Sequence, residues 1–225
     1  PGITRHYVYR KRTIEREVLG AIARGATQVV NLGAGFDTLA MRLAPRHPGV
    51  RFIEMDHPAT QRVKRDALLN AGITAANLQL LPVDFTTETL AGHLAGSGVF
   101  DPDRVTVAVV EGVLMYLDDA AVRVLFQSLH AGFRDRLTVV FTAAEPADRS
   151  RHSYGPLLKL YLRLKGEALH WTCAHEQLPG FLETQGYRLE RWAGGGRFRS
   201  DFGSAASPAV VHEGEYVAVA VRLSD

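Results

Sequence analysis

The chain has 225 residues, a formal net charge of +2, 46% hydrophobic residues and 22% charged residues, which is typical of a folded globular protein and unlike a disordered chain. Its single cysteine, Cys173, excludes an internal disulfide framework and any zinc site built from several cysteines. No apolar run approaches the roughly 20 residues that cross a membrane, the first residues lack the apolar core of a signal peptide, and the basic residues are scattered. We therefore expect one cytoplasmic domain over residues 1–225, with no membrane and no nucleic acid as partner.

Helices and strands alternate along the first part of the chain. A helix is predicted within residues 1–25, because Ile14, Val18 and Ile22 recur at helical spacing. Short apolar strands are predicted at 28–32, 51–55, 78–83, 105–110 and 137–141. A helix is expected after each of the first four strands. This alternation predicts a parallel, doubly wound α/β sheet.

The rhythm changes after the fifth strand. Residues 147–173 lack a strand pattern and carry a helical apolar stripe, which predicts a helical lid or substrate insertion. A helix is then predicted at 175–185, a strand at 187–192, a polar loop at 194–208 and a final strand at 216–223. Because no helix separates the last two strands, we expect the final strand to run antiparallel.

Glycines, acids and one aromatic residue follow the first four strands. They are Gly33-Ala34-Gly35, Asp56, Asp84-Phe85 and Glu111. Ligands of open α/β sheets bind beyond the carboxyl ends of the strands, and carboxylates gathered there repel one another unless a ligand brings donors. Ribose hydroxyls and an adenine amino group are such donors. Because an acid follows each of the three strands after the glycine turn, the sequence predicts a nucleoside-binding site there.

The glycine turn by itself is a weak signal, and each acid alone could be a helix cap or a solvated loop residue. Thr38 occupies the position of the third glycine of the dinucleotide-binding fingerprint, so that glycine is absent. An adenosine ligand without a pyrophosphate therefore fits better, which favours S-adenosylmethionine. A nicotinamide oxidoreductase and a non-catalytic adenosine-binding protein are the alternatives.

Four motifs together resemble the leucine carboxyl methyltransferase-like family of class I S-adenosylmethionine-dependent methyltransferases, and within it the bacterial polyketide, tetracenomycin-type O-methyltransferases. The resemblance covers nearly the whole chain. It implies a Rossmann-like sheet of seven strands in the order 3-2-1-4-5-7-6 with strand seven antiparallel. The motifs are Asn31-Leu-Gly-Ala-Gly-Phe-Asp-Thr38, Glu54-Met-Asp-His-Pro58, Pro82-Val-Asp-Phe85 and Glu111-Gly-Val-Leu-Met-Tyr-Leu117.

The resemblance also implies roles for matched positions. Arg12 would hold the cofactor carboxylate from the N-terminal helix, since a guanidinium binds a carboxylate at two points. Asp56 would bind the ribose, Asp84 and Phe85 the adenine, and Glu111 would face the amino acid end. The implied cofactor-binding residues are Arg12, Gly33, Ala34, Gly35, Asp56, Asp84, Phe85 and Glu111.

The expected reaction is O-methylation of a small natural-product carboxylic acid, because the family branch suggests it and no acid–histidine pair is apparent. A carboxylate is already ionised at neutral pH and needs no base. A phenolic or alcoholic hydroxyl is the alternative acceptor, and it would need one. Tyr116, His170 and Trp171 are expected to contact the substrate. No catalytic residue, metal or oligomeric state is assigned from the sequence, and no metal is expected.

Overall fold

The computed structural model describes residues 2–85, 87–96, 98–134, 136–146, 170–202 and 213–224. The strands are β1 (Gln28–Leu32), β2 (Arg51–Asp56), β3 (Leu78–Pro82), β4 (Thr106–Val110), β5 (Leu137–Ala144), β6 (Tyr187–Ala193) and β7 (Glu215–Arg222). They form one sheet in the order β3-β2-β1-β4-β5-β7-β6. The first five strands run parallel, and β7 pairs antiparallel with both β5 and β6. Both the predicted order and the antiparallel last strand are confirmed.

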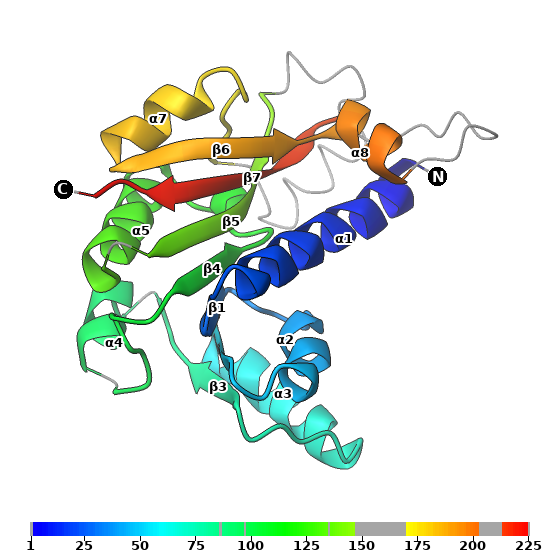
Figure 1. Cartoon of the computed structure of the whole chain (residues 1–225), viewed down its shortest axis with the longest axis vertical. Helices are drawn as coiled ribbons and strands as arrows, with labels where there is room; N and C mark the ends of the chain where they lie inside the picture. The colour runs from blue at the N-terminus through cyan, green and yellow to red at the C-terminus, as the bar shows by residue number, and fades with distance from the viewer. Residues whose placement is uncertain are drawn as a thin grey trace.

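Helices cover both faces of this sheet (Figure 1). The described helices are α1 (Gly2–Ala23), α2 (Leu39–Leu43), α3 (Pro58–Asn70), α4 (Leu90–Gly96), α5 (Asp119–Gly132), α7 (Leu178–Thr184) and α8 (Gly195–Phe202), with short 3-10 turns η1 (Ala44–Arg46) and η2 (Leu114–Tyr116). One buried cluster joins the sheet to α1, α2 and α8. A second joins its other face to α4, α5 and α7. Residues 147–169, most of the predicted lid, lie outside the described residues.

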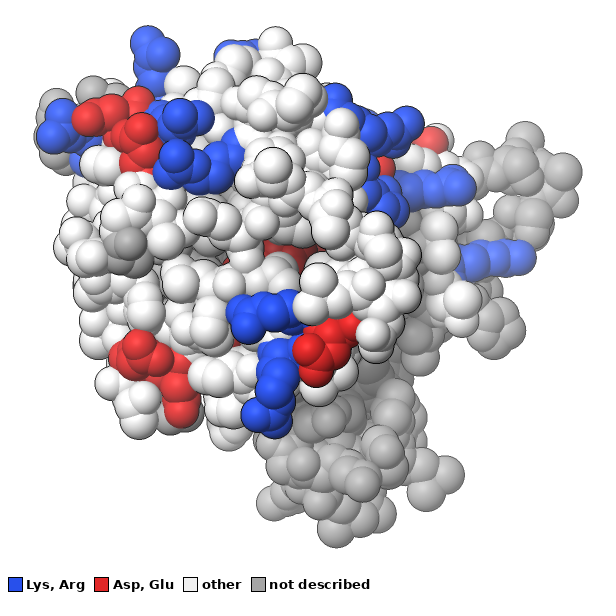
Figure 2. All heavy atoms as spheres, turned by 90° about the horizontal axis from the view of Figure 1, so that it is seen from below, with Lys and Arg blue, Asp and Glu red and all other residues white. Residues whose placement is uncertain are grey.

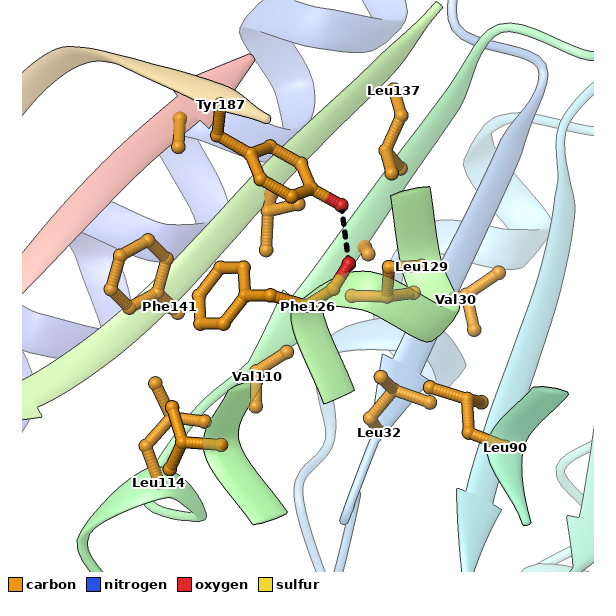
Figure 3. Close-up of a cluster of buried hydrophobic side chains, with 14 of the residues drawn as sticks. Val30, Leu32, Leu90, Val110, Leu114, Phe126, Leu129, Leu137, Phe141 and Tyr187 are labelled. Carbon is orange, nitrogen blue, oxygen red and sulfur yellow. Dashed lines mark hydrogen bonds between the residues drawn. The ribbon is translucent and has the colours of Figure 1, made fainter. Parts of the chain in front are cut away.

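The second cluster is built around aromatic contacts (Figure 3). The ring of Phe126 makes edge contacts with Phe141, Phe181 and Tyr187, with centroids 5.3–5.7 Å apart. The Tyr187 hydroxyl donates a hydrogen bond of 3.0 Å to the carbonyl oxygen of Phe126. Burial raises the pKa of Tyr187, so this hydroxyl stays protonated and keeps its donor role. Helix α5 is thereby fixed to β5, β6 and α7.

One element differs from the prediction. The segment 194–208 was expected to be a polar loop, but its first part forms helix α8. Phe198 is fully buried and meets the ring of His6 edge-on, with centroids 5.4 Å apart, and Phe202 stacks on Tyr9 at the same separation. The three glycines that suggested a loop are outweighed by this packing against α1, since tertiary contacts routinely override local propensity.

Candidate functional site

The glycine turn after β1 and the acid after β2 form one hydrogen-bonded unit. Gly33 and Gly35 have φ values of +63° and +47°, a region that glycine adopts without strain. The Asp56 carboxylate accepts from the backbone N–H groups of Gly35 at 2.7 Å and His57 at 2.8 Å. A Cβ on Gly35 would meet nothing within 4 Å. The turn therefore has open space beside it, bounded by a carboxylate.

Two basic residues of α1 bind the acid that follows β4. The Glu111 carboxylate accepts from Arg10 Nε at 2.8 Å and from Lys11 Nζ at 2.9 Å, and its side chain is only 6% exposed. Lys11 Nζ also lies 3.3 Å from Asp37 Oδ1, beside the glycine turn. The two cations thus connect α1 to the ends of β1 and β4.

Arg12, predicted to hold the cofactor carboxylate, lies on the exposed side of α1. Within the described ranges it makes no ion pair. Its neighbours in sequence, Arg10 and Lys11, are the basic residues of α1 that contact Glu111. The helical period explains the difference, because Arg10 stands four residues before the buried Ile14 and so belongs to the inward face.

A second acid, Glu215, also binds Arg10. Glu215 Oε2, at the start of β7, accepts from Arg10 Nη1 at 2.7 Å and lies 3.0 Å from His6 Nε2. Burial alone would raise the pKa of Glu215, but the His6 hydrogen bond and the Arg10 charge outweigh it and bring that pKa below its ordinary value. Glu215 is therefore ionised at neutral pH. Sequence reasoning missed His6, Arg10, Lys11 and Glu215, although His6, Arg10 and Ile14 share one helical stripe.

Exposed aromatic rings lie around the same edge of the sheet. Phe36 follows the glycine turn and is 67% exposed, and Phe85 follows β3 and is 46% exposed. Tyr116, in η2 after β4, is 48% exposed. Asp84 is half-buried beside Phe85, with Oδ2 3.9 Å from His57 Nε2. Large exposed apolar groups gathered at one edge are typical of a ligand site.

The three predicted substrate residues lie together, but only two of them have exposed side chains. The backbone N–H of His170 donates to the Met115 carbonyl oxygen at 2.8 Å, which brings His170 next to Tyr116 of η2. Both side chains are exposed. Trp171 is 5% exposed and packs against Phe181, with ring centroids 5.3 Å apart. Its position favours core packing over contact with a substrate.

An acid–histidine pair, which sequence reasoning did not find, lies after β5. His175 Nδ1 is 2.7 Å from Glu145 Oε1. The imidazole also packs on the ring of Trp192, with centroids 4.1 Å apart. The two partners are 30 residues apart in the chain, so no local spacing could have revealed them.

In the part of the chain that the structure describes, no group of three or more His, Cys, Asp or Glu side chains is arranged to hold a metal ion. No helix in those ranges has the length and apolar character to cross a membrane. Two cavities of about 430 and 450 Å³ open at the opposite edge of the sheet, near Arg51 and Arg136, and neither includes a candidate residue.

Charges of both signs are mixed on the face that Figure 2 presents. Blue and red side chains lie in small groups separated by uncharged surface. On that face, the described residues do not form the continuous basic stripe on which nucleic-acid binding depends.

Comparison with known proteins connects this site to a family. The model of the family described as "Leucine carboxyl methyltransferase" matches residues 1–130, which include α1, the glycine turn and the acids after β2, β3 and β4. A protein of Mycobacterium marinum named "Putative S-adenosyl-L-methionine-dependent methyltransferase" is 37% identical over 131 residues, which are 56% of this chain and 39% of that protein. The chain thus spans about two-fifths of the length of that curated relative.

Solved structures share the fold at low sequence identity. The mitomycin 7-O-methyltransferase MmcR aligns with a TM-score of 0.59 and 19% identity, over 90% of this chain and 52% of that chain. The O-methyltransferase NcsB1 of neocarzinostatin biosynthesis, solved with S-adenosyl-L-homocysteine and 1,4-dihydroxy-2-naphthoic acid, aligns with a TM-score of 0.58 and 12% identity, over 88% of this chain and 50% of that chain. Because the family model covers more than half of the chain and its motifs meet at one edge of a methyltransferase-type sheet, this chain belongs to the leucine carboxyl methyltransferase family.

Proposed function

We propose that this chain carries an S-adenosylmethionine-dependent O-methyltransferase that acts on a small natural product. The observation that carries the proposal is the charge cluster facing the glycine turn. It holds two cations, Arg10 and Lys11, and three carboxylates, Asp37, Glu111 and Glu215. These two cations and three carboxylates leave one negative charge in excess. S-adenosylmethionine combines an ammonium, a carboxylate and a sulfonium, a single net positive charge.

The donor and acceptor set fits each part of that cofactor. Arg10 and Lys11 offer N–H donors to its carboxylate, and Glu111 offers an acceptor to its ammonium. Asp56 stands beside the open glycine turn as an acceptor for ribose hydroxyls. Asp84 and the exposed ring of Phe85 remain the proposed adenine contacts. Arg12 is exposed, and we assign the carboxylate to Arg10 and Lys11 in its place.

When bound, the cofactor supplies a methyl group on a positively charged sulfur, which is a good leaving group. The protein has to align an acceptor oxygen with that methyl group and exclude water, and orientation of this kind accounts for much of the rate of such reactions. Tyr116 and His170 are the described exposed side chains best placed to border the acceptor. The tight hydrogen bonding of Asp56 and Glu111 fixes the cofactor end of the site.

Replacement of Asp56 tests the cofactor site. Asp56→Ala is expected to weaken S-adenosylmethionine binding by about 10- to 150-fold, which corresponds to roughly 1.5–3 kcal/mol for hydrogen bonds to a charged acceptor. Titration calorimetry measures the affinity directly. Asp66→Ala, an exposed aspartate on α3, is the control and should bind like the wild type. Unchanged affinity in Asp56→Ala would remove the ribose assignment.

No metal is expected to take part. Displacement at a sulfonium needs no Lewis acid, and the donors around Glu111 are basic side chains rather than further ligands. Methyl transfer should therefore proceed at an unchanged rate after treatment with a chelator, measured with isotopically labelled cofactor. Loss of turnover that magnesium or zinc restores would show this expectation to be wrong.

Two acceptor classes follow from different observations. The resemblance to tetracenomycin-type enzymes favours a carboxylate, which requires no base. The His175–Glu145 pair favours a hydroxyl, because it can supply the base that a hydroxyl acceptor needs. The sequence showed no such pair, and that was one reason to expect a carboxylate. NcsB1, whose fold this chain shares, was solved with a compound that carries both kinds of oxygen, 1,4-dihydroxy-2-naphthoic acid. That compound is a suitable first acceptor for this chain.

A further inference from the structure

The His175–Glu145 pair has the geometry of an oriented imidazole. The Glu145 side chain is 11% exposed, and Oε1 lies 2.7 Å from His175 Nδ1. A carboxylate accepts a hydrogen bond from Nδ1–H, so in the neutral imidazole Nε2 is the nitrogen that can accept a proton. The other described groups near the ring include Glu176, with Oε1 3.6 Å from Nε2, and the rings of Trp192 and Tyr216.

The ring is also held in place from the sheet. Trp192 of β6 packs against it at an interplanar angle of 40°, and Tyr216 of β7 meets it edge-on, with centroids 6.4 Å apart. The Tyr216 hydroxyl donates to the Cys173 carbonyl oxygen at 2.9 Å, and the Cys173 N–H donates to the Ala144 carbonyl oxygen at 2.9 Å. The segment that carries His175 is thereby tied to the end of β5. His175 remains 31% exposed, so its imidazole is accessible.

The pair lies at the acceptor end of the proposed site. The Gly112 N–H, next to Glu111, donates to Thr142 Oγ1 of β5 at 2.8 Å, which sets Glu111 level with Thr142. Glu145 follows three residues later, about 10 Å further along an extended chain. This places Glu145 and His175 beyond the carboxyl end of β5, where substrates of open α/β sheets bind.

We propose that His175, oriented by Glu145, is the general base for methyl transfer to a hydroxyl group, so that the acceptor is a phenol or alcohol. This inference rests on the proposed function. The hydroxyl proton moves to Nε2 of His175, and an electron pair of the acceptor oxygen forms the new bond to the methyl carbon. The sulfur–methyl bond breaks as this bond forms, its electron pair stays on sulfur, and the sulfonium becomes a neutral thioether. Glu145 stabilises the resulting imidazolium, which returns its proton to solvent.

The charged and titratable groups around the base define its pH behaviour. The acidic groups that face the imidazole are Glu145, from the end of β5, and Glu176, from the same segment. Burial raises the pKa values of Tyr216 and Cys173, so both stay neutral. If the base must be unprotonated, the rate rises tenfold per pH unit at pH values below the pKa of that base. The rate on a carboxylate acceptor has no such limb in this range.

The test measures methyl transfer against pH for the wild type, His175→Gln and His175→Ala. The acceptors are 1,4-dihydroxy-2-naphthoic acid, a simple naphthol and a nitro-substituted naphthol that is ionised at neutral pH. The naphthol rate should fall about 10²- to 10⁴-fold in His175→Gln, the range that general bases contribute. The acid limb should disappear, and the nitro-substituted acceptor should lose far less. Added imidazole should partly restore His175→Ala.

The matched control is His93→Gln. His93 of α4 has its Nε2 2.8 Å from Oε2 of Glu88, which precedes that helix, so the chain offers a second histidine–glutamate pair. Its replacement should leave the pH profile unchanged. Methylation of the naphthoic acid at a hydroxyl supports the proposal. Methylation only at its carboxylate, an acid limb that persists in His175→Gln, or no transfer to any hydroxyl would overturn it.

The failure of this inference differs from the failure of the proposed function. A chain that binds S-adenosylmethionine in calorimetry and methylates only carboxylates retains the proposed function and loses the base. A chain that neither binds the cofactor nor transfers its methyl group loses both. Thermal melting of each variant shows whether a lost activity reflects a lost fold.

Discussion

Arg10→Ala is expected to weaken S-adenosylmethionine binding by about 30-fold or more, since truncating one partner of a buried, hydrogen-bonded charge pair costs roughly 2–5 kcal/mol. Arg10 bridges two acids, Glu111 at 2.8 Å and Glu215 at 2.7 Å, and its own side chain is 16% exposed. Its removal takes away a donor to the cofactor carboxylate. It also leaves both acids without their shared guanidinium. Calorimetry of cofactor binding and thermal melting separate these two consequences.

Arg12→Ala is the matched control for Arg10→Ala. The two residues lie on the same helix, but Arg12 is exposed and Arg10 is not. We expect affinity within about twofold of the wild type for Arg12→Ala, because exposed charges contribute little. Arg10→Lys should recover only part of the affinity, since an ammonium cannot bridge two acids through a planar fork. A large loss in Arg12→Ala with little loss in Arg10→Ala would assign the cofactor carboxylate to Arg12, as the family resemblance implies.

Lys64→Met is expected to lower the free energy of unfolding by about 3–5 kcal/mol, the usual effect of breaking a buried ion pair from one side. Lys64 Nζ lies 2.5 Å from Glu54 Oε2, and the two side chains are 6% and 0% exposed. Lys64 is the cation that compensates the buried Glu54 carboxylate. Lys64 also donates to the Asp37 carbonyl oxygen at 2.6 Å, so its loss should loosen the glycine turn.

The Lys64 effect should depend on pH. Burial raises the pKa of Glu54 above its ordinary value, and Lys64 opposes that shift. Without Lys64 the pKa of Glu54 rises further, the native state binds a proton that the unfolded state does not, and stability falls as pH rises through that window. Urea unfolding should therefore show a larger deficit at pH 8 than at pH 5.

Two further variants check the origin of the Lys64 effect. Arg65→Met, an exposed neighbour on α3, should stay within about 0.5 kcal/mol of the wild type. Glu54→Gln combined with Lys64→Met should recover much of the lost stability. A double variant no more stable than Lys64→Met would show that the ion pair is not the cause.

Most helices and strands of the fold can be predicted from local patterns of apolar residues in the sequence. Continuous apolar runs such as Val107–Val110 predict strands buried on both faces, and the structure buries each of these four residues completely. The acids that end β2, β3 and β4 lie at one edge because parallel strands all point the same way. Local signals failed at α8, where the burial of Phe198 against α1 outweighs three glycines.

The sequence by itself determined the alternation of strands and helices, the glycine turn and the acids that follow the strands, because each depends on residues close together in the chain. Only the tertiary structure decided which basic residue of α1 meets Glu111, since successive residues of a helix point about 100° apart and a single position separates Arg12 from Lys11. It also decided that His175 meets Glu145 and that Glu215 holds Arg10 across 205 residues of chain. Such pairs form because the sheet brings distant strand ends together, and the spacing of residues along the chain does not predict these contacts.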